Sequence, residues 1–291
     1  MTLSSSGSGT AERLDASLVA QTVPPGSMRY YAWLFTPDDK RDVLVALFLL
    51  DDELRSTARS DHHDVAHTRL NWWHEEIDRL ARGIPVHPAT RVLGNGLRML
   101  DVEPGRLRAL IEAAAMDLAR ITYTDDTELE GYLERSGGVT AEFVARWLLV
   151  PQHAQAATLQ VATRIGALLR RVETLRDLRV DTTAGRIYFP LTMLEHAGIE
   201  LPDLRAAILS SRTRDFLQSI LEKLRKELAD ANDSIPAADR AALRPLLVLA
   251  GLHLRLLDRI ARDFASHAPQ RVELAPFEKL WCAWRWARRA R

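Results

Sequence analysis

The segment 168–190, LLRRVETLRDLRVDTTAGRIYFP, carries the pattern from which the fold of this chain is best inferred. Asp177 and Asp181 are four residues apart in it, so on a helix their carboxylates lie about one turn apart on the same face. Mg²⁺ typically binds through one or two carboxylates together with the oxygens of a substrate phosphate. The spacing therefore predicts a Mg²⁺ site at Asp177 and Asp181 for a substrate that carries a diphosphate.

A structural role for the same two aspartates is an open alternative. Four arginines surround them in the sequence, namely Arg170, Arg171, Arg176 and Arg179. An aspartate near an arginine at helical spacing usually forms a solvated ion pair. The spacing alone does not separate metal binding from ion pairing.

The order of residues in this segment resembles the second aspartate-rich motif of the squalene and phytoene synthase family. Asp177 is followed by three residues, Asp181, three more residues and then the loop sequence GRIYFP. The resemblance implies that Asp177 and Asp181 hold metal and that Arg186 and Tyr188 shape the diphosphate end of the site. The family usually has an asparagine four residues before the first aspartate, and this chain has Glu173 there.

The composition excludes several classes of protein. The 291 residues contain 39 basic and 39 acidic side chains, so no net charge attracts nucleic acid or an acidic membrane. Cys282 is the only cysteine, which excludes an internal disulfide framework and fits a reducing compartment. No stretch approaches the roughly 20 apolar residues of a membrane span, and the first residues lack the pattern of a signal peptide. We therefore expect a soluble cytoplasmic protein that does not bind nucleic acid.

Most of the sequence has helical periodicity, with apolar residues three and four apart between prolines and glycines. The expected helices are 11–22, 38–58, 63–82, 88–100, 104–121, 126–149, 153–181, 202–232, 237–266 and 275–290. Residues 1–10 are rich in Ser and Gly and are expected to be a disordered tail before one all-α domain at 11–291. The resemblance implies the isoprenoid synthase fold, a single-domain helical bundle around a central cavity.

The segment 27–59 resembles the start of the same family, where a helix carries the first of two aspartate-rich motifs. Counting from Pro37 places the metal-binding aspartates of that motif at Arg55 and Arg59, so both positions are inverted in charge. One interpretation is that the arginines hold phosphate oxygens directly, in place of a metal ion. The other is that they are surface residues paired with nearby aspartates on a helix whose former function has decayed.

The segment 117–139 resembles the middle helices of the family, in which a tyrosine and small residues line the tunnel for the prenyl chain. The corresponding residues here are Tyr132, Gly137 and Gly138. Glycine costs a helix about 1 kcal/mol relative to alanine, so two adjacent glycines mark either a helix break or a gap that admits another chain close to the backbone. The residues alone favour the break, and the resemblance favours the tunnel.

The C-terminal segment 277–291, FEKLWCAWRWARRAR, is basic and aromatic. Indole rings prefer the headgroup layer of a membrane, and arginines are attracted to anionic lipid. This composition fits peripheral contact with the inner face of a membrane. The commoner arrangement is a terminal helix whose tryptophans dock on the protein core while its arginines stay in water.

Two functions follow from the resemblance, and both stay open. The first is an active prenyltransferase that condenses prenyl diphosphates with Mg²⁺, as squalene and phytoene synthases do. The second is a non-catalytic relative that binds a prenyl diphosphate or a related isoprenoid lipid. It would be similar to the respiratory complex I assembly factors of this family, and it would have a protein partner. The inversion at Arg55 and Arg59 favours a degenerate member without ordinary head-to-head synthase activity.

Overall fold

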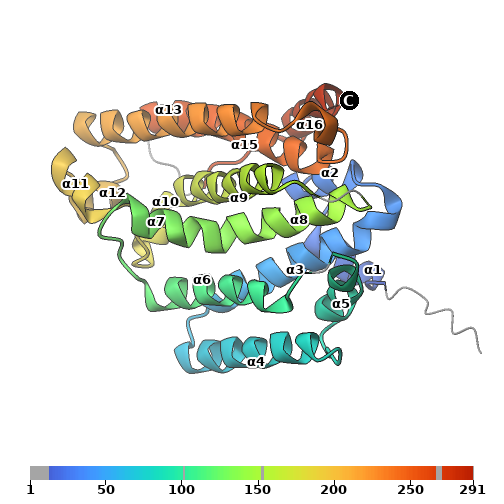
Figure 1. Cartoon of the computed structure of the whole chain (residues 1–291). Helices are drawn as coiled ribbons and strands as arrows, with labels where there is room; N and C mark the ends of the chain where they lie inside the picture. The colour runs from blue at the N-terminus through green and yellow to red at the C-terminus, as the bar shows by residue number, and fades with distance from the viewer. Residues whose placement is uncertain (1–12, 101, 152–153, 267–270, 291) are drawn as a thin grey trace, which may run out of the picture.

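The computed structural model describes residues 13–100, 102–151, 154–266 and 271–290 as a bundle of α-helices (Figure 1). The expected tail at 1–10 lies outside the described residues. Within them no residue belongs to a β-strand, and the only extended pairing is an isolated bridge between Tyr123 and Pro190. The prediction of an all-α fold is therefore confirmed.

The helices of the first half are α1 (Ala16–Thr22), α2 (Met28–Leu34), α3 (Arg41–Ala58), α4 (His63–Ala81), α5 (Pro88–Leu100), α6 (Arg108–Ala119), α7 (Asp126–Leu133) and α8 (Val139–Leu149). Short 3₁₀ turns, η1 (Asp38–Lys40) and η2 (Pro104–Leu107), precede α3 and α6, and the π-helical η3 (Glu134–Gly138) joins α7 to α8. The second half contains α9 (Ala156–Arg176), α10 (Leu178–Thr183), α11 (Leu191–Ala197), α12 (Leu201–Arg205), α13 (Ser211–Asp233), α14 (Ala237–Arg240), α15 (Arg244–Ser266) and α16 (Pro276–Arg289).

The central element is α9, which contacts η3, α8, α13 and α15. Buried side chains occur on all sides of this helix, among them Leu159, Ile165 and Val172. A helix that is buried all round belongs in the interior of a fold. In Figure 1, α3 and α6 lie between α9 and α4, while α13 and α15 cover its other side; α4 and α16 are at opposite ends of the bundle.

Three expected helices are interrupted, and the first of them, predicted at 153–181, is divided at Asp177 into α9 and α10. The helix predicted at 202–232 is divided into α12 and α13, because Ser210 caps α13 by accepting a hydrogen bond from the Thr213 N–H at 3.1 Å. The helix predicted at 237–266 is divided into α14 and α15. Pro245 stands in the first turn of α15, where a missing N–H costs no helical hydrogen bond.

Two short helices, α2 and α11, were not predicted. Each has 7 residues, which is too short for an apolar period to be recognised. A local signal for α2 does exist, since Ser27 caps it by accepting a hydrogen bond from the Tyr30 N–H at 3.0 Å.

Gly137 and Gly138 lie inside a continuous helical path from α7 through η3 to α8, which agrees with the helix expected at 126–149 and rules out the interpretation of the two glycines as a helix break. The glycines instead allow a close helix crossing. A Cβ on Gly137 would overlap the carbonyl oxygen of Gly166 on α9, and a Cβ on Gly166 would overlap the carbonyl oxygen of Gly137. A Cβ on Gly138 would lie 3.0 Å from the carbonyl oxygen of Thr163. The gap is filled by the backbone of α9.

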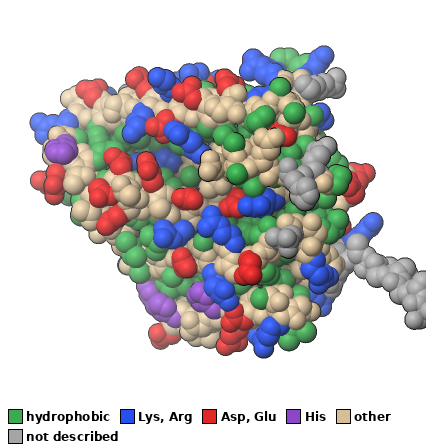
Figure 2. All heavy atoms as spheres, in the orientation of Figure 1, with side chains coloured by type: hydrophobic (Ala, Val, Ile, Leu, Met, Phe, Trp, Pro, Cys, Tyr) green, Lys and Arg blue, Asp and Glu red, His purple; other side chains and the backbone are tan. Residues whose placement is uncertain are grey.

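The surface mixes both signs of charge. On the face shown in Figure 2, acidic and basic side chains alternate with apolar ones, as the balanced composition leads us to expect. In the part of the chain that the structure describes, none of the helices is both long and apolar enough to cross a membrane.

The helix crossing leads to a prediction about stability. Gly166→Ala should lower the free energy of unfolding by about 2 kcal/mol, because the added methyl group forces α9 and η3 apart. Gly131→Ala is the matched control on α7. Its Cβ would meet only the flexible end of Arg135, so the better helix propensity of alanine should raise stability by up to about 1 kcal/mol. Urea denaturation measures both, and equal effects would contradict the close crossing.

Candidate functional site

A cavity of about 720 Å³ lies between α3, the η3–α8 segment, α9 and α15. Its volume falls within the roughly 300–1,000 Å³ of ligand sites in proteins. Much of the wall is apolar or has no side chain, and these residues are Met28, Phe48, Gly137, Ala141, Val144, Gly166, Leu169, Leu246 and Leu249. This part of the wall suits a hydrocarbon chain.

The remainder of the wall is charged, and positive charge predominates. Its arginines are Arg29, Arg55, Arg59, Arg170, Arg176 and Arg271. Its carboxylates are Asp51, Asp52 and Glu173. A concave site with more guanidinium groups than carboxylates attracts anions. The cavity as a whole therefore fits a molecule with an anionic head and an apolar tail.

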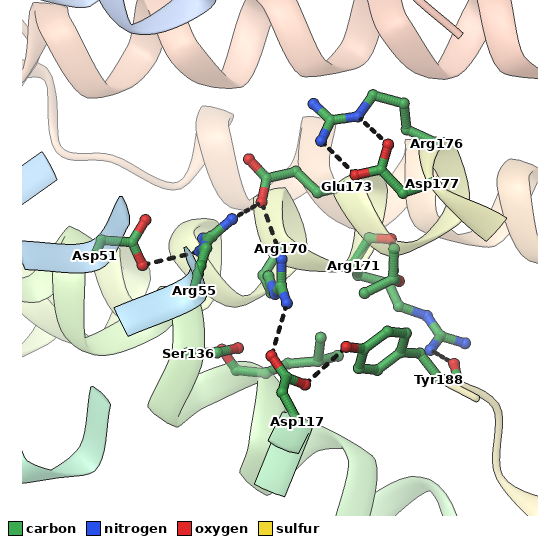
Figure 3. A network of polar contacts seen from close by, with 12 residues as sticks. Asp51, Arg55, Asp117, Ser136, Arg170, Arg171, Glu173, Arg176, Asp177 and Tyr188 are labelled. Carbon is green, nitrogen blue, oxygen red and sulfur yellow. Dashed lines mark hydrogen bonds and ion pairs between the residues drawn. The ribbon is translucent and has the colours of Figure 1, made fainter. Parts of the chain in front are cut away.

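Arg55 joins two helices across the charged end (Figure 3). Its Nε donates to Asp51 Oδ1 at 3.0 Å, one turn earlier on α3, and its Nη1 donates to Glu173 Oε2 on α9 at 2.5 Å. Arg170 of α9 lies 3.5 Å from the same Glu173 oxygen, and Asp51 also accepts a hydrogen bond from Arg29. Arg55 is thus a largely enclosed bridge between helices and not a solvated surface residue.

Burial and ion pairing act in opposite directions on this bridge. Burial favours the neutral forms of both groups, but the carboxylates of Asp51 and Glu173 outweigh it and raise the pKa of Arg55. For Glu173, burial is outweighed chiefly by Arg55 and by His253, whose Nε2 lies 3.8 Å from Glu173 Oε1, so the pKa of Glu173 lies well below the ordinary value. Both groups are therefore charged at neutral pH.

Asp177 and Asp181 lie one helical turn apart, as the sequence predicts. The N–H of Asp181 donates to the carbonyl oxygen of Asp177 at 2.9 Å, and both side chains are buried. Arg176 binds both oxygens of Asp177, with its Nη2 2.7 Å from Oδ2 and its Nε 3.0 Å from Oδ1. Arg271 approaches the same carboxylate at 3.3 Å. Burial opposes the charge of Asp177, but Arg176 lowers its pKa.

Asp181 has arginine partners too. Arg186 Nε donates to its Oδ1 at 3.2 Å, and Arg59 Nη2, from α3, lies 4.0 Å from that atom. The same Arg59 nitrogen is 3.7 Å from Asp177 Oδ2. Burial raises the pKa of Asp181, and Arg59 and Arg186 offset this only in part. Arg59 therefore faces both aspartates, as expected if α3 and α9–α10 form two sides of one site.

In this arrangement the carboxylate oxygens of Asp177 and Asp181 are paired with arginines, which does not fit coordination of a Mg²⁺ ion. Both oxygens of Asp177 accept hydrogen bonds from Arg176, and Arg59 lies against the two aspartates from the facing helix. Among the described residues, no three His, Cys, Asp or Glu side chains are grouped to hold a metal. A divalent cation here would have to displace guanidinium groups of like charge. The metal role of Asp177 and Asp181 stays a prediction.

Tyr132 and Tyr188 lie behind the wall and hold Arg170 in place. Their rings are stacked with centroids 5.3 Å apart, and burial raises the pKa of Tyr132 to about 12. Arg170 Nη2 donates to the Tyr132 hydroxyl at 2.6 Å, and Asp117 accepts from Arg170 at 3.3 Å and from the Tyr188 hydroxyl at 2.7 Å. Figure 3 shows Arg170 extending from α9 between Glu173 and Asp117. These tyrosines position a cavity arginine.

The predicted site residues fall into two groups. Arg55, Arg59 and Gly137 line the cavity. The other predicted site residues are described in the structure but are not part of the lining, and they are Tyr132, Gly138, Arg186, Tyr188 and the predicted metal ligands Asp177 and Asp181. Their predicted contacts with substrate or metal stay predictions.

Sequence reasoning missed several residues of the charged end. Glu173 had a usable signal, because it precedes Asp177 by one helical turn and so shares its face. Arg29, His253 and Arg271 come from distant segments, and no spacing in the sequence connects them with α9. Only the fold brings them together.

Residues 24–278 match the family model for squalene/phytoene synthase. The chain belongs to the squalene/phytoene synthase family. It is similar to the chloroplastic phytoene synthase 2 of Solanum lycopersicum, with 23% identity over 253 residues that cover 85% of this chain and 81% of that protein. It is also similar to the presqualene diphosphate synthase of Rhodopseudomonas palustris, with 24% identity over 251 residues that cover 84% of this chain and 88% of that protein. The chain spans 62% of the chloroplastic phytoene synthase 1 of Zea mays.

Solved structures show the same architecture. A dehydrosqualene synthase in complex with ligand superposes with a TM-score of 0.81 at 15% identity, covering 93% of this chain and 94% of that chain. The isoprenoid synthase fold is therefore confirmed. Family membership implies prenyl diphosphate substrates, and the family typically uses Mg²⁺. These matches establish the family but not the complex I assembly factor branch.

The bridge between α3 and α9 leads to a prediction about stability. Glu173→Gln should lower the free energy of unfolding at neutral pH by about 3 kcal/mol, because it leaves Arg55 and Arg170 enclosed without this carboxylate. The matched control is Asp258→Asn, which removes an exposed pair with Arg225 at 2.9 Å and should cost about 1 kcal/mol or less. Denaturant titration of the three proteins measures this, and equal losses would contradict the bridge.

The lowered pKa of Glu173 predicts that its contribution to the free energy of unfolding depends on pH. Its folded-state pKa is lowered from 4.5, so its stabilisation is fully present above that value and is lost as the pH falls through the folded-state pKa. The stability difference between wild type and Glu173→Gln should be constant above about pH 5 and narrow in more acidic solution. Unfolding curves over a pH series test this, and a difference that widens in acid would contradict the lowered pKa.

Proposed function

We propose that this chain binds a prenyl diphosphate or a related anionic isoprenoid lipid through fixed arginines, without ordinary Mg²⁺-dependent head-to-head condensation. The observation that carries the proposal is the set of ion pairs made by Arg55 and Arg59 with Glu173, Asp177 and Asp181. In this proposal the first aspartate motif of the family is degenerate. Arginines stand where counting from Pro37 places the metal ligands of that motif, and Arg59 faces Asp177 and Asp181 while Arg55 pairs with Glu173.

The chemistry of arginine supports binding in place of metal. A guanidinium group offers a rigid fork of donors that matches phosphate oxygens, and it stays charged at all physiological pH values. Arg59 and Arg271 line the cavity, and their side chains are only partly buried, so they can reach a diphosphate. A fixed guanidinium does not act as a Lewis acid on a departing diphosphate. We therefore expect tight binding with little or no turnover.

The apolar part of the cavity is evidence that the ligand has a hydrocarbon tail. Two polar atoms in its wall, His253 Nε2 and Thr140 Oγ1, are buried without a hydrogen-bond partner among the described residues. Buried polar atoms are normally satisfied by protein, water or ligand. Neither atom has surface exposed to the cavity, so the support for a hydrocarbon tail comes from the apolar lining, which includes Phe48, Leu169 and Leu249.

Calorimetric titration with farnesyl diphosphate, in MgCl₂ or in EDTA, tests the proposal. Binding should have the same affinity in both solutions. Arg59→Gln with Arg271→Gln should weaken it about tenfold or more, since each removes a charged donor to phosphate. Arg225→Gln, on the surface of α13, is the matched control and should leave the affinity unchanged.

Product analysis of the same mixtures separates this function from the alternatives. Released diphosphate or a new hydrocarbon that requires Mg²⁺ would contradict the proposal and establish an active prenyltransferase. That second candidate is favoured by the apolar cavity and by the similarity to phytoene and presqualene diphosphate synthases. Absence of binding in both solutions would contradict both and favour the non-catalytic assembly role.

A further inference from the structure

The C-terminal helix α16 has one face that packs on the protein. Ala283 and Ala287 are buried in an apolar cluster with Tyr31 of α2 and with α15. The indole of Trp286 lies directly over Gly251 of α15, where a Cβ would overlap the ring. These contacts fix the rotation of α16 about its axis.

A second face of α16 is apolar and exposed. Leu280 and Trp281 come three and four residues after Phe277, and Trp284 comes three residues after Trp281, so the four side chains form one stripe. In chain order their exposed fractions are 77%, 49%, 54% and 42%. The rings of Trp281 and Trp284 stack with centroids 5.1 Å apart. The expectation that the tryptophans of this segment dock on the core is therefore wrong for Trp281 and Trp284.

Positive charge accompanies the stripe. Among residues 276–289 there are four basic side chains and one acidic side chain, Glu278, which pairs with Arg255. Arg285, Arg288 and Arg289 are exposed, and no carboxylate of the described residues forms an ion pair with them. The guanidinium of Arg288 lies over the Trp284 ring at 4.8 Å. The free positive charges are thus at the edge of the aromatic face.

We propose that α16 is an interfacial helix that docks this protein on the surface of an anionic lipid bilayer. Aromatic and aliphatic side chains on one helix face, with arginines beside them, are the features of helices that lie in the headgroup layer. Anionic lipid attracts each nearby arginine, and because the basic and acidic side chains of the whole chain balance, the positive charge beside the stripe is a local feature of α16. Contiguous exposed apolar surface on a protein marks an interaction site. A protein partner is an alternative that the experiment below distinguishes.

The position of α16 connects this surface with the cavity. Helix α2 packs on α16, and the Tyr31 hydroxyl donates to the Pro276 carbonyl oxygen at 3.4 Å. Met28 of the same helix lines the cavity and also packs against the apolar cluster beneath α16. Both helices on which α16 packs, α2 and α15, contribute residues to the cavity wall, so the docked helix and the cavity share the same two neighbours.

Vesicle flotation of the full chain tests the proposal. The probes are phosphatidylcholine vesicles with and without phosphatidylglycerol, at low and high salt. The protein should float with the anionic vesicles and be released by salt. Trp281→Ser with Trp284→Ser should lower the partition coefficient about tenfold or more, because two large apolar groups no longer enter the interface. Arg288→Gln with Arg289→Gln should lower it about fivefold per residue, on anionic vesicles only.

The matched control is Val65→Ser with Ile84→Ser. These two apolar side chains are also exposed, but they lie on and just beyond α4, at the opposite end of the bundle from α16 (Figure 1). The control should float like wild type. Equal losses in the control and the tryptophan variant would overturn the proposal, as would failure of wild type to float with either vesicle. Self-association that only the tryptophan variant abolishes, without flotation, would identify a second copy as the occupant and would also overturn it.

These outcomes are independent of the proposed ligand. The vesicles contain no isoprenoid, so their binding reports on α16 alone. Affinity of the Trp281→Ser, Trp284→Ser variant for soluble farnesyl diphosphate should equal that of wild type, because neither tryptophan lines the cavity.

Discussion

The ion pair between Arg55 of α3 and Glu173 of α9 is the interaction on which the site depends. It connects the two helices that form facing walls of the cavity, and Arg55 is the main partner that keeps the buried carboxylate of Glu173 charged. Arg170 extends the network from Glu173 to Asp117 and the stacked tyrosines, so the polar contacts run from α3 through α9 to α6. The close crossing of η3 and α9 at Gly137 and Gly166 fixes the same helix from its other side. Electrostatics and packing thus place one helix, α9, with little freedom.

Under the proposed function, this arrangement changes the chemistry that the family fold supports. A metal ion can enter with the substrate and stabilise a departing diphosphate, whereas a guanidinium that is already paired with a carboxylate is part of the protein. Arg59 contacts Asp177 and Asp181 at the longer distances of the set, 3.7 and 4.0 Å, so it is the arginine whose pairing a diphosphate can replace at least cost. Arg59 then exchanges one set of anionic partners, the two aspartates, for another, the phosphate oxygens of the ligand. Such an exchange favours binding and offers no new assistance to bond cleavage.

The fold was largely predictable from the sequence, because long amphipathic helices bounded by prolines have strong periodic signals. The spacing of Asp177 and Asp181 correctly predicted that they lie one turn apart, whereas no pattern in the sequence predicted that Arg55 of α3 pairs with Glu173 of α9. The structural role of Gly137 was not predictable, because glycine suits both a helix break and a close helix crossing. Only the contact with Gly166 distinguishes the two. The pairing of Arg271 with Asp177 joins residues far apart in the chain, and no local pattern encodes it. The outward orientation of Trp281 depends on how α16 rotates over Gly251, which is a tertiary property.

The central claim is that arginines occupy the place of metal in this member of the squalene/phytoene synthase family. Its most direct test is a calorimetric titration of Mg²⁺ into the complex with farnesyl diphosphate, for wild type and for Arg55→Asp combined with Arg59→Asp and Glu173→Asn. The triple variant restores the carboxylates and the asparagine that the family pattern expects, and it removes the buried glutamate that would lose its partner. The account predicts no Mg²⁺ binding by wild type and a new Mg²⁺ site in the triple variant. Saturable Mg²⁺ binding by the wild-type complex, lost in Asp177→Asn with Asp181→Asn, would contradict it.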